Sequence, residues 1–268
     1  MLGSITRHMT KALKSGAREL RRSDGAVIAY EREAAQDLKL PGVVFLHGLR
    51  SDKGGTKAEA LTRHARDRGY GLLRFDMFGH GASSGRFEDG GISRWVEDAV
   101  AVLDELTSGP QILVGSSMGG WVMVKTAMAR PQKVMGLVGI AVAPDFTEDL
   151  MWAGFDAGQR AALMTAGAVD LPSDYDDGPY RISRHLIEDG RNNLVLRADI
   201  PITCPVRLIH GQRDAAVPWE TSLRLAANIL GDDVMTHLVK DGDHRLSRPQ
   251  DLTRLCGLVD ELVTKGCS

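Results

Sequence analysis

Short apolar runs alternate with longer amphipathic stretches along most of this 268-residue chain. The runs are rich in Val, Ile, Leu and Phe, which is typical of strands that are buried on both faces. Because most of them end at glycine or at a polar residue, each has a defined boundary. The pattern predicts strands over residues 26–30, 43–46, 72–75, 112–114, 137–142, 206–209 and 235–239.

The stretches between these runs carry apolar residues at intervals of three and four, as helices do. Helices are predicted over residues 54–68, 93–106, 118–129, 220–230 and 251–263. Strands that alternate with helices need crossover connections, and these join parallel strands. The sequence therefore predicts an α/β fold with a mostly parallel central sheet and helices on both faces.

The segment over residues 145–199 does not follow this alternation. It has helical patches at 150–155, 159–164 and 180–189 but no clear strand. Connections in α/β folds usually have about 2–6 residues, so a segment of this length is an insertion. We predict a single domain over residues 23–268 that carries a small helical cap at 145–199.

Composition excludes several classes of protein. With 33 basic and 35 acidic side chains, the net charge of −2 gives no reason to expect nucleic-acid binding. Three cysteines are too few for a disulfide framework or a zinc site. No apolar run approaches the roughly 18–20 residues of a membrane span. The sequence predicts no nucleic-acid partner, no membrane span and no metal, and it leaves the oligomeric state open.

Residues 1–22 form a basic stretch with six Lys or Arg side chains and one acid, Glu19. The stretch lacks the apolar core of a secretory signal, while its arginines resemble those of a mitochondrial transit segment. A frayed basic N-terminal extension is the favoured interpretation. A cytoplasmic location is therefore predicted, with a mitochondrial location as the alternative.

The strongest chemical motif is Gly-Ser-Ser-Met-Gly at 115–119, between a predicted strand and a predicted helix. A nucleophilic serine must project from a sharp turn, and glycines two positions away on either side let the backbone make that turn. The sequence predicts Ser117 as the nucleophile. A plain Gly/Ser loop is the alternative.

A serine hydroxyl needs a base to take its proton. His244 lies in a loop directly after the last predicted strand, and we predict that it is this base. His80 and His210 are the rivals: His80 precedes the nucleophile in the chain, and His210 ends a strand and is expected to pack there.

The third catalytic group is predicted to be Asp214, directly after the strand at 206–209. A carboxylate there could orient the imidazole of the base and stabilise its protonated form. Asp145 is the reserve candidate. Asp241 and Asp243 are expected to form turns.

Two backbone amides are needed to hold the oxyanion that forms during acyl transfer. The residue after the nucleophile supplies one of them, so Met118 is predicted. The loop after the strand at 43–46 supplies the other, predicted as Leu49 with Arg50 second. Gly48 would let that loop come close to the nucleophile.

Taken together, these motifs resemble the α/β-hydrolase family over nearly the whole chain. The segments 55–58, 109–121 and 210–219 are similar to a mitochondrial abhydrolase-domain subfamily of palmitoyl-protein thioesterases and acyl-glucuronide esterases. The resemblance implies ester or thioester hydrolysis by Ser117, Asp214 and His244. One segment departs from those relatives, which tend to have Pro-Gly and an aromatic residue where this chain has His-Gly-Leu-Arg at 47–50. The acyl-group preference therefore stays open.

The sequence thus predicts a carboxylesterase or thioesterase-type serine hydrolase that forms an acyl-enzyme on Ser117 and needs no cofactor. Its substrate is a small-molecule or acyl-protein ester or thioester. The alternatives are an acyltransferase, a perhydrolase or a carbon–carbon bond hydrolase with the same triad, and a non-catalytic ligand-binding module. Substrate-binding residues are predicted as Arg50 and three residues of the cap, although these three could equally be packing residues: Met151, Trp152 and Phe155.

Overall fold

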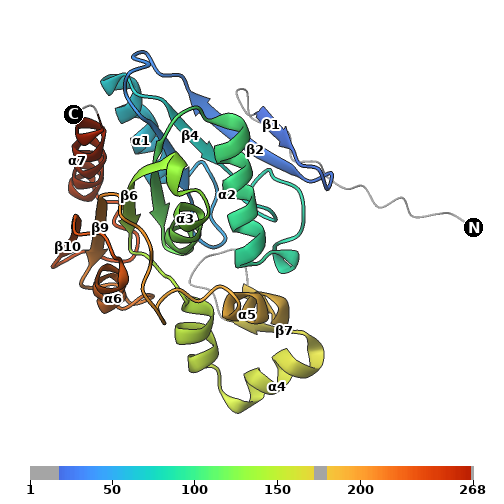
Figure 1. The fold of residues 1–268 in the computed structure, drawn as a ribbon. Helices are drawn as coiled ribbons and strands as arrows, with labels where there is room; N and C mark the ends of the chain where they lie inside the picture. Colours follow the sequence, from blue (N-terminus) through green and yellow to red (C-terminus); the bar gives the residue numbers. More distant parts are fainter. Residues whose placement is uncertain (1–17, 172–179, 267–268) are drawn as a thin grey trace, which may run out of the picture.

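The computed structural model describes residues 18–171 and 180–266. Its centre is an eight-stranded sheet with the order β1-β2-β4-β3-β5-β6-β9-β10, shown in Figure 1. All pairs from β4 to β10 are parallel, while β1 and β2 are antiparallel to their neighbours. The strands are β1 (Arg18–Arg21), β2 (Val27–Glu33), β3 (Gly42–Leu46), β4 (Leu72–Phe75), β5 (Gln111–Ser116), β6 (Val134–Ile140), β9 (Val206–Gly211) and β10 (Val234–Val239).

Helices cover both faces of the sheet. One apolar core lies under α1 (Thr56–Arg68) and α7 (Pro249–Lys265). The other lies under α2 (Ile92–Leu106), α3 (Met118–Ala129) and α6 (Glu220–Asn228). Because both faces are covered, every residue of β4, β5 and β9 is buried. These observations confirm the α/β prediction.

The insertion between β6 and β9 forms a cap, whose elements lie together at one end of the molecule in Figure 1. It holds a π-helix, two helices and a two-stranded antiparallel sheet: η3 (Thr147–Trp152), α4 (Ala157–Ala166), β7 (Ala168–Leu171), β8 (Tyr180–Ser183) and α5 (Arg184–Arg191). The small sheet corrects the expectation that the cap has no strand. Each of its strands has only four residues, which is too short for a two-residue alternation to be recognised.

The N-terminal boundary also moves. Arg18–Arg21 were assigned to the basic extension but pair with β2 as β1, with Leu20 buried against the core. A single apolar residue among charged ones gives no detectable alternation, so the sequence did not predict this strand. Residues 1–17 of the predicted extension lie outside the described residues.

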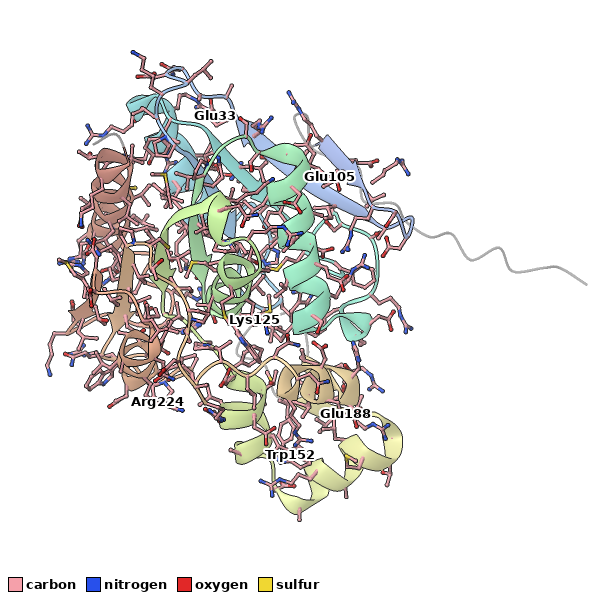
Figure 2. All side chains as sticks on the ribbon, viewed as in Figure 1. Glu33, Glu105, Lys125, Trp152, Glu188 and Arg224 are labelled. Carbon is pink, nitrogen blue, oxygen red and sulfur yellow. The ribbon has the colours of Figure 1, made fainter. Side chains whose placement is uncertain are left out.

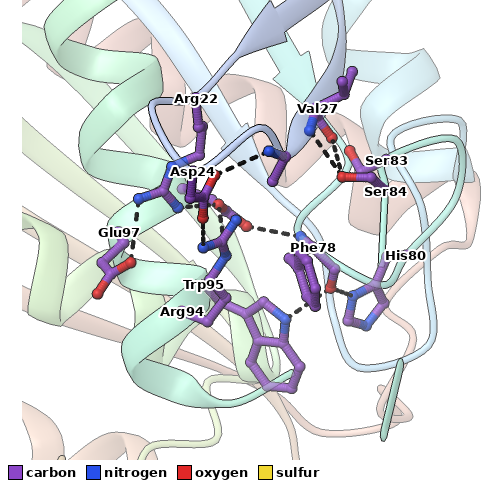
Figure 3. A network of polar contacts seen from close by, with 12 residues as sticks. Arg22, Asp24, Val27, Phe78, His80, Ser83, Ser84, Arg94, Trp95 and Glu97 are labelled. Atoms are coloured by element: carbon purple, nitrogen blue, oxygen red, sulfur yellow. Dashed lines mark hydrogen bonds and ion pairs between the residues drawn. The ribbon is translucent and has the colours of Figure 1, made fainter. Parts of the chain in front are cut away.

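Polar contacts, drawn in Figure 3, tie the loop after β4 to the beginning of β2 and to α2. The Val27 amide donates to Ser84 Oγ at 2.8 Å, and the Phe78 amide donates to the α2 carboxylate of Asp98 at 2.7 Å. Arg22 donates to the same carboxylate at 2.6 Å. These contacts tie the loop to its neighbours, and its buried His80 packs against the ring of His47, with 4.9 Å between the ring centroids.

No helix within residues 18–171 and 180–266 is long and apolar enough to cross a membrane.

Candidate active site

Ser117 occupies the sharp turn between β5 and α3, as predicted. Its φ of 55° lies in the left-handed region that side chains rarely adopt, so the turn is strained. A Cβ on Gly115 would lie 2.5 Å from the Gly119 carbonyl oxygen, and one on Gly119 would lie 2.3 Å from the Leu46 carbonyl oxygen. Both glycines are therefore required for the turn. The Ser117 amide donates to Ile140 on the neighbouring strand at 2.9 Å and fixes the position of the turn.

The three predicted catalytic side chains meet at the carboxyl ends of the parallel strands. His244 Nε2 lies 3.1 Å from Ser117 Oγ, within hydrogen-bond distance. On the other side of the ring, Nδ1 lies 2.7 Å from Asp214 Oδ2. Asp214 is carried by the loop after β9 and His244 by the loop after β10, and these two strands are parallel neighbours. The topology thus brings together residues that are far apart in the sequence.

The surroundings of Asp214 favour its charged form. Its side chain is fully buried, which by itself opposes ionisation. Hydrogen bonds from His210 and His244 to Oδ2, and from the Ala216 and Val217 amides to Oδ1, outweigh that cost. They hold the pKa of Asp214 far below its usual range. The carboxylate therefore stays ionised beside His244.

The rival histidines lie elsewhere. His210 is fully buried on the far side of Asp214, where its Nε2 lies 3.0 Å from Asp214 Oδ2. The sequence predicts only that His210 packs in the strand, and its contact with Asp214 is a further finding of the structure. A histidine four positions before an aspartate at the end of a strand is the pattern that could have indicated it. His80 packs against the ring of Trp95, and burial lowers its pKa to about 3.

Asp145, the reserve acid, has a different task. It is fully buried and accepts hydrogen bonds from the Val195 and Leu196 amides at 2.8 and 2.9 Å. It also forms an ion pair with Arg197 at 3.2 Å. Asp145 therefore fastens the end of the cap to its beginning, and Asp214 is the carboxylate on His244. Burial raises the pKa of Asp145 despite these bonds.

The amides predicted for the oxyanion both lie at the nucleophile. Leu49 and Met118 line the same cavity as Ser117, and among the described residues neither amide donates to a protein acceptor. Met118 is the first residue of α3, so its amide also lies at the positive end of the helix dipole. A Cβ on Gly48 would contact the Ser117 Cβ at 3.4 Å, which measures how closely the two loops approach. The two amides remain free to bind an oxyanion.

His47 connects the loop after β3, which carries Leu49, to the loop after β4. The Met77 amide donates to His47 Nε2 at 3.1 Å, so the ring proton resides on Nδ1. Nδ1 then donates to the Gly48 carbonyl at 2.8 Å. Burial lowers the pKa of His47, which keeps the ring neutral and preserves this arrangement.

The cavity above Ser117 has a volume of about 900 Å³. Its lining includes charged side chains, namely Arg50, Asp52, Lys57, Arg213, Asp243 and Arg245. It also includes apolar side chains, namely Leu49, Met118, Phe146, Leu150, Met151, Leu171 and Val217. Burial lowers the pKa of Lys57 to about 8, and its amine donates to the Arg245 carbonyl at 2.6 Å. The cavity is thus amphipathic.

Of the four predicted substrate-binding residues, two line the cavity and two do not. Arg50 and Met151 line the cavity, whereas Trp152 and Phe155 do not. Trp152, labelled in the cap in Figure 2, contacts the guanidinium groups of Arg160 and Arg191, which lie 5.2 and 4.5 Å from its ring centroid. Phe155 is buried beside it. Successive residues of a helix point in different directions, so Trp152 and Phe155 pack the cap while Met151 borders the cavity.

A comparison with protein families agrees with this geometry. Residues 43–255 match the model of the alpha/beta hydrolase family. The chain therefore belongs to the α/β hydrolase family, as the motifs suggested.

Individual relatives narrow the class. The mouse mitochondrial palmitoyl-protein thioesterase ABHD10 (Mus musculus) is 38% identical over 247 residues, which cover 92% of this chain and 82% of the relative. The solved structure of this mouse protein has a TM-score of 0.85, covering 94% of this chain and 99% of its own. A hydrolase structure from Agrobacterium vitis is 41% identical with a TM-score of 0.88, covering 94% and 100%. These relatives place the chain among α/β hydrolases of the esterase and thioesterase type.

The comparisons do not support the predicted cytoplasmic location. The mouse and human relatives are mitochondrial by name, which agrees with the alternative compartment.

Proposed function

We propose that this protein hydrolyses carboxylic esters or thioesters through an acyl-enzyme on Ser117. One observation carries the proposal: His244 contacts Ser117 Oγ through Nε2 and the buried Asp214 carboxylate through Nδ1, both within hydrogen-bond distance. Ser117 also lines the amphipathic cavity, together with Leu49 and Met118, whose amides have no acceptor among the residues that the structure describes. A nucleophile, a base, an orienting carboxylate and an oxyanion site are the four parts that acyl transfer needs.

In the first half of the reaction, Ser117 Oγ attacks the acyl carbonyl carbon while His244 Nε2 accepts the hydroxyl proton. The carbonyl oxygen becomes an oxyanion and receives hydrogen bonds from the Leu49 and Met118 amides. The bond to the leaving oxygen or sulfur then breaks, and His244 donates its proton to that atom. The products are a free alcohol or thiol and an acyl ester on Ser117.

In the second half, water replaces the leaving group. His244 Nε2 accepts a proton from water as its oxygen attacks the acyl-enzyme carbonyl. The bond to Ser117 Oγ breaks, the serine regains its proton from His244, and a carboxylic acid leaves. Asp214 stays ionised throughout and stabilises the protonated imidazole each time it forms.

The cavity suggests how a substrate lies. Leu150 and Met151 of the cap contribute to the apolar lining, where an acyl chain would bury apolar surface. Arg50 also lines the cavity, and we assign the polar leaving group to the region around its guanidinium group. Thioesters of acylated proteins belong to the proposed range because the similar mouse enzyme is named as a palmitoyl-protein thioesterase.

The test is steady-state hydrolysis of p-nitrophenyl esters and matched acyl thioesters of graded chain length. Ser117→Ala should lower kcat/KM by about 10³-fold or more, because the residual rate comes only from binding and the oxyanion site. Ser116→Ala, the neighbouring serine, is the matched control and should stay within a few-fold of wild type. Equal turnover by wild type and Ser117→Ala would overturn the proposal.

A further inference from the structure

We infer that His210 is a positioning residue of the catalytic triad, holding the Asp214 carboxylate in the orientation that His244 requires. The inference rests on the proposed function, since it assigns a task within the same triad. His210 is the last but one residue of β9, and its side chain is fully buried. It is not among the residues that line the cavity, so it acts through Asp214.

Both ring nitrogens of His210 are engaged. Nε2 faces two acceptors, Asp214 Oδ2 at 3.0 Å and the Val217 carbonyl at 3.2 Å. Because neither of these acceptors can donate a proton, Nε2 carries the hydrogen. Nδ1 lies 2.7 Å from Ser222 Oγ on α6 and, in the neutral ring, accepts the serine hydroxyl proton. The Ser222 hydroxyl thereby favours the tautomer in which His210 donates to Asp214.

The two histidines meet on the same oxygen atom. Asp214 Oδ2 accepts from His210 Nε2 on one side and from His244 Nδ1 on the other, at 3.0 and 2.7 Å. The other oxygen, Oδ1, is held by the Ala216 and Val217 amides. Donors on both oxygens restrict the rotation of the carboxylate about its Cβ–Cγ bond. His210 is the donor that shares Oδ2 with His244, so it helps to keep this oxygen directed at the His244 ring.

A purely structural role would leave a different pattern. A buried histidine that only fills space needs partners for its nitrogens, but these need not include the catalytic carboxylate. His64 is such a case: its Nε2 lies 2.9 Å from Asp260, between α1 and α7 and away from Ser117. His64 and His210 thus form a matched pair of His–Asp contacts, of which only one touches the triad.

The experiment compares kcat and KM for a short p-nitrophenyl ester across single variants, with folding checked by circular dichroism and thermal melting. His210→Leu removes the donor and should lower kcat about 10- to 100-fold, the range expected for a lost hydrogen bond to a charged group. KM should stay within about twofold, because the cavity wall is unchanged. His210→Gln keeps an amide N–H at similar reach and should restore kcat to within about fivefold of wild type.

Two further variants complete the design. Ser222→Ala removes the hydroxyl that fixes the tautomer and should lower kcat about threefold or more. His64→Leu removes the matched contact and should leave kcat at the wild-type value. The inference is overturned if folded His210→Leu keeps wild-type kcat, or if His210→Gln is no better than His210→Leu. If His210→Leu does not fold, Ser222→Ala decides, and an unchanged kcat there overturns the inference.

Ser117→Ala is measured in parallel to separate this inference from the proposed function. If Ser117→Ala and wild type turn over equally, the proposed function fails and the assignment of His210 fails with it. If they differ while the His210 and Ser222 variants match wild type, only the assignment of His210 fails.

Discussion

At the scale of single residues, the candidate site depends on the contacts of His244 with the Ser117 hydroxyl and with the Asp214 carboxylate. Ser117, Asp214 and His244 could be predicted because their types, chain order and positions after strands are characteristic. The contact of His210 with Asp214 is missed because a strand-end histidine by itself has the same pattern whether it packs or donates, and only its spacing of four from Asp214 could have indicated the contact. The prediction that Trp152 and Phe155 bind substrate differs from the structure for a related reason. An apolar residue in a cap can face the cavity or the interior of the cap, and the sequence pattern is the same in both cases.

The carboxylate on His244 can be tested by removing its charge. Asp214→Asn keeps the shape of the side chain but cannot stabilise a protonated imidazole, and its amide can hold the wrong tautomer. We expect kcat to fall by about 10³- to 10⁴-fold with little change in KM. The measurement is steady-state turnover of a short ester, with melting temperature as the folding control. A loss below tenfold in folded protein would show that Asp214 has another task.

The pH dependence of activity follows from the same charges. Hydrogen bonds keep the pKa of Asp214 far below its usual range, so this carboxylate stays ionised when the pH is lowered moderately. A protonated His244 cannot accept the Ser117 proton, so activity falls on the acid side. We expect log(kcat/KM) to decline there with a slope of one, reporting a single proton, in profiles measured between about pH 4 and 9. A slope of two would mean that a second group, Asp214 included, takes up a proton as well.

At the scale of elements, the turn between β5 and α3 must lie directly against the end of β3. A Cβ on Gly119 would be 2.3 and 2.4 Å from the carbonyl oxygens of Leu46 and His47. Backbone atoms cannot move aside as a side chain can. The distance between the nucleophile turn and the loop that carries the Leu49 amide is therefore set by the absence of a side chain at residue 119.

Gly119→Ala should accordingly separate the two loops. We expect a loss of about 1–3 kcal/mol in the free energy of unfolding from overpacking, together with at least a tenfold loss of kcat. Gly257→Ala is the matched control, because Gly257 is an exposed position of α7 with open space around its Cβ. That control should gain about 0.5–1 kcal/mol from helix propensity and keep full activity. Urea unfolding and ester turnover measure both effects. Wild-type turnover in Gly119→Ala would contradict the required contact.

Continuous apolar runs and long periodic helices could be predicted, whereas short strands of mixed apolar and polar residues could not. The strand at 72–75 and the helix at 118–129 agree with β4 and α3 to the residue. The strands β1, β7 and β8 have four residues each and exist because of their pairing partners. Strand pairing depends on residues that are distant in the chain, so the local pattern of apolar and polar positions cannot identify these strands.

At the scale of the whole molecule, the cap and the sheet have to be held together around the cavity. Asp145 joins the two ends of the cap through the Val195 and Leu196 amides. Asp149 on η3 contacts Arg224 of α6, labelled in Figure 2, at 3.3 Å and so links the cap to the sheet domain. The sequence indicated the existence of the cap but not its cavity, because the shape of a cavity depends on many distant contacts at once.

Weakening the Asp145 contacts should act on the cap and not on the triad. Asp145→Ala leaves two buried amides without an acceptor and should lower the free energy of unfolding by about 2–4 kcal/mol. Because the cap supplies Leu150 and Met151 to the apolar lining, KM for long-chain esters should rise several-fold. The kcat for a short ester should stay within a few-fold of wild type. A loss of short-ester kcat comparable to that of Asp214→Asn would contradict this division of roles.

The most direct test of the central claim is to locate the reactive hydroxyl. A fluorophosphonate reacts covalently with a serine whose proton is taken by a neighbouring base, and peptide mass spectrometry identifies the modified residue. We expect a single adduct on Ser117, much slower labelling in His244→Ala and none at that position in Ser117→Ala. An adduct on another residue of the folded protein, or equal labelling of wild type and His244→Ala, would contradict the proposed catalytic triad.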